Sequence, residues 1–202
     1  MTDKQKRTQR GRPKTFDREG VLAAAMTAYW REGPSGLSLN EVCRRAGVSK
    51  PGLYREFGDE DGLIDAVVSL YAKQMLEPAW AMTRKDQPFS HTLQNMVDFM
   101  TNGSESRPIG CLYAKMQSSP TKLGPKSQAH LQQIRERAIA TYASWLEGAR
   151  ARKEIADQVC IEVAAEFLHA QFVHILSQVA AGEEADNIRA QAELAFAGLS
   201  RA

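Results

Sequence analysis

Apolar side chains recur at helical spacing along almost the whole chain, from Phe16 to its end. Runs that alternate apolar and polar residues, which would indicate β-strands, are absent, and β-branched and aromatic residues rarely cluster. Residues three and four positions apart share one face of an α-helix. The pattern therefore predicts an all-α protein with about nine helices.

Helix-capping residues divide the first third of the chain into four helices. Side chains that can accept hydrogen bonds at helix N-termini stand at Asp17, Ser38, Ser49 and Asp59. Ser38-Leu39-Asn40-Glu41 has the form of a capping box, in which the glutamate bonds back to the serine N–H. Gly33 and Gly47 suit the ends of the first two helices, and Pro51 suits the first turn of the third.

Longer helices with less definite boundaries follow. The apolar faces predict helices over approximately 90–102, 109–117, 125–153, 157–181 and 184–199. We expect the prolines to lie in the connections, because proline disfavours helix in the residue before it. These prolines are Pro78, Pro88, Pro108 and Pro120.

Composition adds limits to this picture. The 202 residues are 43% hydrophobic and 25% charged, as in an ordinary globular protein, and no apolar stretch approaches the roughly 20 residues that span a bilayer. The N-terminus does not have the form of a signal peptide, so we expect a cytoplasmic protein without a membrane partner. Three widely spaced cysteines form no metal-ligand motif, and we expect no metal and no cofactor.

Charge is distributed unevenly along the chain. Residues 1–58 hold 12 Lys and Arg against 6 Asp and Glu, whereas the remaining residues hold 14 against 18. A basic front on an acidic body suggests that the front alone meets a polyanion, although a solvated basic tail would give the same balance.

The second and third helices, joined over 46–49, have the form of a helix-turn-helix. In such a motif the second helix enters the major groove of DNA while the first crosses the backbone. An αα-corner without a DNA role is the alternative. The side chains of the motif that do not pack in the core lie on its outer surface, where they can contact phosphates or base edges. They are Ser49, Lys50, Gly52, Tyr54 and Arg55, and Pro51 and Gly52 keep the start of the helix slim enough for close approach.

Four segments around this motif carry a family resemblance. They are 21–25 (VLAAA), 37–49 (LSLNEVCRRAGVS), 53–57 (LYREF) and 62–67 (GLIDAV). In sequence and register they resemble the DNA-binding domain of the tetracycline-repressor (TetR/AcrR) family. The resemblance covers about the first third of the chain.

The resemblance implies a domain organisation and a function. It implies a flexible basic arm over 1–15, a DNA-binding domain over 16–62 and an antiparallel helical domain for ligand binding and dimerisation over 63–202. The protein would then be a homodimer on a palindromic operator, most simply a repressor that an unidentified small molecule releases. Ser38 and Asn40 would also touch DNA, and Arg10 and Arg12 of the arm would enter the minor groove.

Two positions depart from the family pattern. Family members commonly carry lysine, which holds a phosphate, at the position of Glu60, but here Asp59, Glu60 and Asp61 place three acids at that helix start. These acids suit the helix dipole but repel DNA, which puts this phosphate contact in doubt. Glu56 replaces an aromatic residue or histidine and could accept a hydrogen bond from a cytosine amino group.

The helices of the body supply candidates for an interface and a pocket. By analogy with the family, the last two helices would form a four-helix bundle between subunits through Val163, Phe167, Ala170, His174, Ala192, Phe196 and Leu199. Aromatic and methionine residues of the middle helices could line a ligand pocket, although plain core is the alternative for each. These are Trp80, Phe99, Met100, Cys111, Leu112, Tyr113, Met116, Tyr142, Trp145 and Phe172.

Cys111 could also react. We expect it in the first turn of a helix, near Arg107 and Lys115, where a thiol pKa is lowered, so oxidants or electrophiles would modify it before Cys43 or Cys160. A thiol-sensing regulator is therefore one alternative. An enzyme with Cys111 as nucleophile and His169 or His174 as base is another, although no catalytic motif supports it and we expect no enzyme. An architectural DNA-binding protein is a third, which the long acidic body disfavours.

Overall fold

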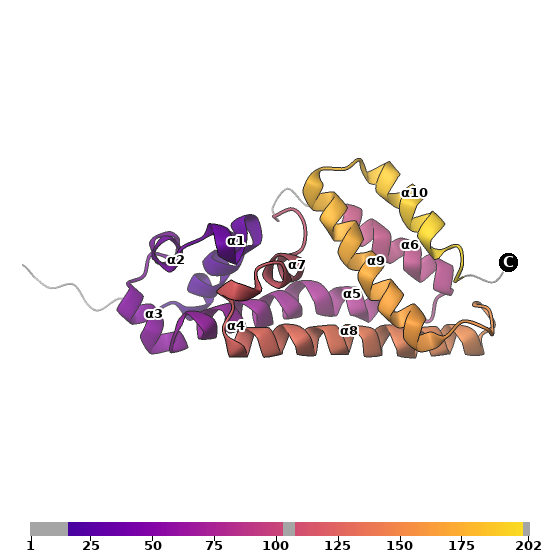
Figure 1. Cartoon of the computed structure of the whole chain (residues 1–202), viewed down its shortest axis with the longest axis horizontal. Coiled ribbons are helices and arrows are strands. Elements are labelled where there is room, and N and C mark those ends of the chain that lie inside the picture. The colour runs from indigo at the N-terminus through magenta and orange to yellow at the C-terminus, as the bar shows by residue number, and fades with distance from the viewer. Residues whose placement is uncertain (1–15, 103–107, 200–202) are drawn as a thin grey trace, which may run out of the picture.

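All the secondary-structure elements that the computed structural model describes, over residues 16–102 and 108–199, are helices (Figure 1). Three helices form one end of the elongated molecule: α1 (Arg18–Gly36), α2 (Leu39–Ala46) and α3 (Lys50–Phe57). The others are α4 (Glu60–Tyr71), α5 (Glu77–Met82), α6 (Phe89–Thr101), α7 (Leu112–Gln117), α8 (Pro125–Ala151), α9 (Ile161–Ala181) and α10 (Ala185–Phe196). The all-α prediction is confirmed.

Helix α1 begins and breaks where the sequence predicts. The Asp17 carboxylate accepts a hydrogen bond of 3.0 Å from the Gly20 N–H at its start. Helical dihedrals stop at Gly33, whose φ of 71° favours glycine. The short turn over 34–36 then leads into α2.

Helices α4 and α5 form one continuous rod. A π-helical turn (Ala72–Leu76) joins them, so the prediction that Pro78 lies in a connection is wrong. Pro78 is instead in the first turn of α5, and the π turn just before it accommodates the missing N–H. When α4 and α5 are counted as one helix, the described residues form nine α-helices, which is the predicted number.

The rod and α8 carry the rest of the molecule. Helix α8 packs along α4 and also against α9, while α6 and α10 pack on α9 at the end away from α2 and α3 (Figure 1). Buried side chains form one continuous apolar core through both ends. None of the described helices is both long enough and apolar enough to cross a membrane.

Several predicted boundaries in the body are displaced. Helix α7 begins at Leu112 and not at residue 109, because Gly110 has a φ of 88°, which a helix cannot contain. Helix α9 begins at Ile161, four residues later than predicted, and α10 ends at Phe196.

Candidate DNA-binding surface and ligand cavity

Side-chain caps fix the two helices of the helix-turn-helix. The Ser38 Oγ accepts a hydrogen bond of 3.3 Å from the Glu41 N–H, and the Ser49 Oγ accepts one of 3.2 Å from the Gly52 N–H. Between them Gly47 takes a left-handed φ of 67°. These local bonds set the angle at which α3 leaves α2.

The Glu41 carboxylate does not close the predicted capping box. It accepts hydrogen bonds from Arg44 at 2.7 and 2.8 Å and from Arg45 at 2.7 Å. These bonds, those of Arg44 first, lower the pKa of Glu41 to about 2. Arg45 also pairs with Glu32. The Glu41 carboxylate therefore binds Arg45, which connects α2 to α1, in place of the Ser38 N–H.

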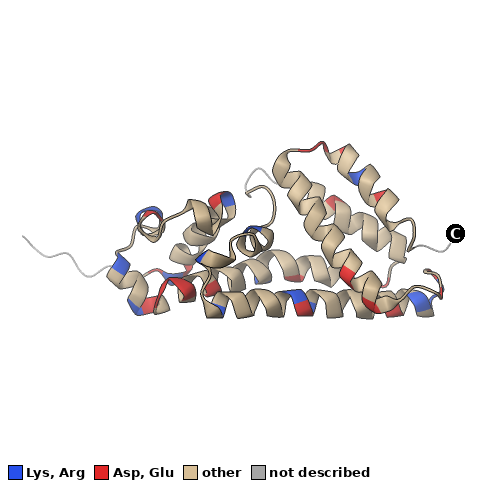
Figure 2. Ribbon diagram, in the orientation of Figure 1, with Lys and Arg blue, Asp and Glu red and all other residues tan. Residues whose placement is uncertain are grey.

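The outer face of α3 is polar and open. Lys50, Pro51, Tyr54 and Arg55 are all exposed, and the Lys50 Nζ lies 5.5 Å from the centre of the Tyr54 ring. The ammonium, guanidinium and phenol groups can donate to phosphate oxygens or to guanine. Three further predicted DNA contacts are exposed on the same motif: Ser38, Asn40 and Ser49. Figure 2 shows basic and acidic positions of the ribbon next to each other at this end of the molecule.

Gly52 lies on the opposite face of α3. It is buried, and a Cβ built on it would meet the Phe16 ring at 3.8 Å and the Ser49 Oγ at 3.2 Å. The prediction that Gly52 belongs to the reading surface is therefore wrong, because this position packs against its own domain. Arg10 and Arg12 lie outside the described residues, and their contacts remain predictions.

Two of the acids near the DNA-binding face are engaged within the protein. The Glu56 carboxylate pairs with the Arg18 Nε at 3.0 Å, and this pair competes with the expected contact to a cytosine. Asp59 caps α4 by accepting a 2.6 Å hydrogen bond from the Gly62 N–H.

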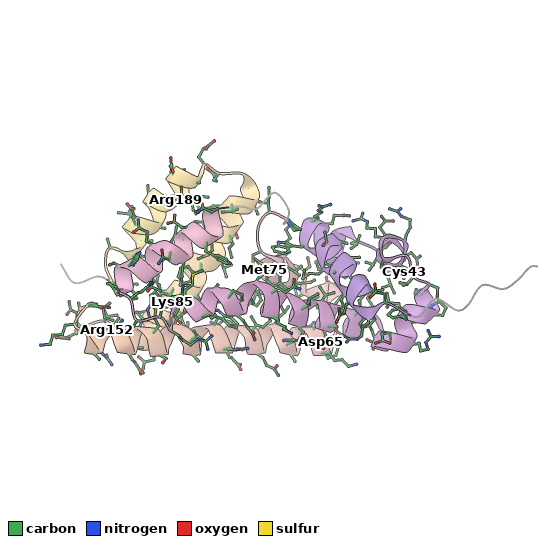
Figure 3. All side chains as sticks on the ribbon, turned by 180° about the vertical axis from the view of Figure 1, so that it is seen from behind. Cys43, Asp65, Met75, Lys85, Arg152 and Arg189 are labelled. Carbon is green, nitrogen blue, oxygen red and sulfur yellow. The ribbon has the colours of Figure 1, made fainter. Side chains whose placement is uncertain are left out.

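Asp61 joins the start of α4 to the start of α8. Its carboxylate accepts bonds from the Lys126 N–H at 2.9 Å, the Ser127 N–H at 3.1 Å and the Ser127 Oγ at 2.5 Å. Burial raises the pKa of Asp61, but these bonds outweigh it and the pKa is lowered. One turn later Asp65, labelled in Figure 3, meets the His130 Nδ1 at 2.7 Å. Asp61, one of the three acids that we expected to repel DNA, thus connects the DNA-binding end to α8, as does Asp65.

A cavity of about 130 Å³ lies between the α4–α5 rod, α6, α8 and α9. The described residues around it include no Asp, Glu, Lys, Arg or His. Half of the predicted pocket residues line it: Trp80, Phe99, Met100, Tyr142 and Phe172.

The other half do not line the cavity and are corrected to core residues. They are Cys111, Leu112, Tyr113, Met116 and Trp145. The Trp145 ring packs on Phe89 with centroids 4.6 Å apart, and the Tyr113 ring lies 6.0 Å from that of His169. Helical spacing identifies inward faces but does not reveal which of them meets a void.

The thiol of Cys111 is sheltered and protonated. Cys111 is the N-cap residue of α7, 4% exposed, and its Sγ accepts a 3.4 Å hydrogen bond from the Tyr71 hydroxyl. Burial raises the pKa of the Cys111 thiol, so the expected activated thiolate is wrong. Cys160, which we expected to react after Cys111, is exposed at the start of α9.

Trp30 connects the cavity to the DNA-binding end. This residue of α1 lines the cavity, and its indole Nε1 donates a 2.9 Å hydrogen bond to the Gly110 carbonyl. Its ring packs edge-on against Tyr71 with centroids 5.0 Å apart. The Lys115 Nζ, expected to activate Cys111, instead donates to the carbonyls of Trp30 at 2.7 Å and Arg31 at 3.0 Å.

Sequence reasoning missed Trp30 because it lies within the segment that resembles a DNA-binding domain. An aromatic residue in the last turn of a helix, just before a glycine break, was the available signal.

Helices α9 and α10 leave an outward surface of small and apolar side chains. Val163, Ala170 and His174 of α9 are exposed and Phe167 is half-buried. Figure 2 shows acidic positions of the ribbon near the start of α9 and none farther along this helix. Leu194 of α10 is 80% exposed.

The predicted face of α10 is wrong. Ala192, Phe196 and Leu199 are buried in the protomer's own core, where the Phe196 ring lies 5.8 Å from that of Phe172. Ile188, Ala192 and Phe196 follow each other at four-residue spacing, so the whole stripe turns inward and leaves Leu194 outside.

Comparisons with known proteins agree with this architecture. The family model for bacterial regulatory proteins of the tetR family matches residues 21–67. The chain is 30% identical over 166 residues to the HTH-type transcriptional repressor ComR of Escherichia coli (strain K12), covering 79% of this chain and 78% of ComR. It is 32% identical over 97 residues to the repressor BdcR of the same organism, covering 48% of this chain and 49% of BdcR.

A solved structure shares the fold over nearly the whole chain. A cysteine mutant of the TetR family transcriptional regulator CifR, complexed with 26-base-pair operator DNA, superposes with a TM-score of 0.80 at 22% identity. The match covers 94% of this chain and 100% of that one. With the identity to ComR over most of both chains, these findings confirm the resemblance: the chain belongs to the tetR family of bacterial regulatory proteins and is a DNA-binding transcriptional regulator.

Proposed function

We propose that this chain is a homodimeric repressor that binds a palindromic operator through α3 and leaves it when a small molecule enters the cavity. One observation carries the proposal: Trp30, a residue of the DNA-binding end, is part of the cavity wall. The names of ComR and BdcR, both repressors, support the sign of regulation. We also propose that control rests on binding without catalysis, since the Cys111 thiol is buried, has a raised pKa and accepts a hydrogen bond from the Tyr71 hydroxyl.

The contacts of Trp30 provide the route for release. A ligand that displaces the wall at Gly110 breaks the Trp30 hydrogen bond and loosens the last turn of α1. Helix α1 packs against α2 and is tied to it by Arg45 and Glu32, so a shift of α1 is transmitted to the helix-turn-helix. A ligand controls the operator only through such a difference in affinity between the two arrangements. We also propose that the DNA-binding domain ends near residue 62 and that the domain for ligand binding and dimerisation follows it.

The outward surface of α9 and α10 is the proposed dimer contact. Small and apolar side chains at Val163, Ala170 and Leu194 allow close approach of a second copy. Two helices from each subunit would form a four-helix bundle. The dimer would place two α3 helices at half-sites about 34–36 Å apart, or a multiple of this distance.

Selection of bound sequences from random DNA tests the function. We expect one palindromic sequence, protected as two half-sites in a footprint, because two identical motifs bind together. Diffuse protection without a preferred sequence would contradict the proposal and favour an architectural protein.

Sedimentation tests the dimer. Ala170→Glu and Leu194→Glu should each give monomers that bind the operator poorly, because buried charges oppose association and single half-sites lose avidity. Ala140→Glu, on the exposed side of α8, is the matched control and should remain dimeric. A stable dimer in both interface variants would show that the contact lies elsewhere.

A further inference from the structure

We propose that the effector is an uncharged molecule about the size of one aromatic ring, with a hydrogen-bond acceptor that meets the Tyr142 hydroxyl. The inference rests on the proposed function, because it names the class of ligand for the cavity beside Trp30. Three features carry it: the absence of charge in the described wall, the hydroxyl of Tyr142 in that wall and the size of the cavity.

The described wall offers no partner for a charged ligand. Its polar side-chain groups are tyrosine hydroxyls, indole N–H groups and the Asn102 amide. A carboxylate or ammonium that enters such a site loses its hydration without gaining an opposite charge. The cavity therefore favours neutral ligands over charged ones of the same shape.

Aromatic rings can also hold cations, but a cation of the protein already lies over one of these rings. Arg137 lies 5.1 Å from the centre of the Trp80 ring, in the outer hollow that shares Trp80 with the cavity. A second cation at the Trp80 ring would be repelled by the first.

Tyr142 supplies the donor. Tyr142 lines the cavity together with Trp80, whose indole N–H can donate but not accept. Burial raises the pKa of Tyr142 far above its ordinary value, which keeps the hydroxyl proton in place. A protonated hydroxyl in the cavity wall has its O–H to donate, and a carbonyl or similar acceptor on the ligand satisfies it.

The volume sets the size of the ligand. The cavity measures about 130 Å³, and a cavity of about 150 Å³ lined by aliphatic and aromatic side chains is known to hold benzene. Met75, Met96 and Met100 are adaptable walls that can accommodate a small substituent. Figure 3 places Met75 midway between the helix-turn-helix and the far end of the body.

Isosteric probes test the ligand class on the full-length protein. Acetophenone is neutral with an acceptor, benzoate is its anionic counterpart, benzamidinium its cationic counterpart, and isopropylbenzene has the same size without an acceptor. Titration followed by calorimetry should show acetophenone binding at least about tenfold more tightly than benzoate, benzamidinium or phenyltrimethylammonium. Equal or tighter binding of any charged probe, or no binding of acetophenone, would overturn the inference.

Two variants locate the binding. Tyr142→Phe should weaken acetophenone about five- to tenfold and leave isopropylbenzene unchanged, because only the donor is lost. Ala79→Phe should remove binding of both neutral probes by filling the cavity, while thermal unfolding verifies that each variant is folded. Undiminished acetophenone binding in either variant would also overturn the inference.

Operator release is measured separately from binding. If acetophenone binds as described and the operator stays bound, the result contradicts the proposed ligand control through the cavity but supports the proposed class of ligand. If a charged probe binds best and releases the operator, the proposed function stands and the ligand class fails.

Discussion

The DNA-binding end and the body of this protein specify their helices in different ways. Each of α1 to α4 begins with a side chain that accepts a hydrogen bond from its first turn: Asp17, Ser38, Ser49 and Asp59. The N-cap residues of α6 to α10 provide no such bond, and the first-turn N–H groups of α6 and α8 are instead bound by the distant carboxylates of Glu154 and Asp61. The first region is therefore defined by local bonds, and the second by long-range bonds and the packing of long faces on one another.

This difference suits the two tasks. A reading helix must present its side chains at a fixed angle, which short capped helices with a tight turn provide. Under the proposed control the body opens for a ligand, and helices held by side-chain packing can shift over one another by small amounts. Asp61 and Trp30 join the two regions, at the start of α8 and at the cavity wall.

Removing a packing residue of the body should have the largest effect on stability. Phe196→Ala should lower the free energy of unfolding by about 3–5 kcal/mol, because it leaves a void beside Phe167 and Phe172. Denaturant unfolding measures this. Glu193→Ala on the exposed side of α10 is the control, with an expected change within about 0.5 kcal/mol. A loss below about 1 kcal/mol for Phe196→Ala would mean that α10 is not held by packing.

Removing a cap of the DNA-binding end should cost less. Ser49→Ala should lower the free energy of unfolding by about 1 kcal/mol, because the Gly52 N–H loses its acceptor. Ser177→Ala, within α9, is a matched serine control that removes only a bond to the Val173 carbonyl. If the two variants lose the same stability, capping does not distinguish the two regions.

Breaking the bonds between Asp61 and the start of α8 by acidification should have the smallest effect on stability among these changes. The pKa of Asp61 is lowered in the folded protein, so its contribution to stability is present above the unfolded pKa of about 3.9 and is lost as pH falls through the folded value. Asp61→Asn should therefore flatten the fall of stability below about pH 4. Identical pH profiles of variant and wild type would show that the connection does not contribute.

What the sequence could predict follows the same division. The starts of the first four helices, the break at Gly33 and the open face of α3 were predictable, because capping and turn residues act within a few positions. Gly52 was misplaced, because its burial depends on Phe16, which is distant in sequence.

In the body, helical spacing predicted that the helices exist but not which face meets which partner. Phe196 and Trp145 were assigned to an interface and a pocket, whereas the structure places both in the core. Cys111 was expected to be reactive from its neighbours in sequence, and its burial beside Tyr71 reverses that expectation. Tertiary packing decides all three, and no local signal records it.

The affinity of α3 variants for the selected operator tests the central claim most directly. Lys50→Ala and Arg55→Ala should each weaken operator binding by about 1–3 kcal/mol if the residue contacts a base. The loss should then differ between operators with different base changes, whereas the loss of a phosphate contact would be about the same on all of them. Arg84→Ala, a cation of the body beyond α5, should bind the operator as the wild type does. Unchanged operator affinity in both α3 variants, or an equal loss in Arg84→Ala, would contradict the claim that α3 reads DNA.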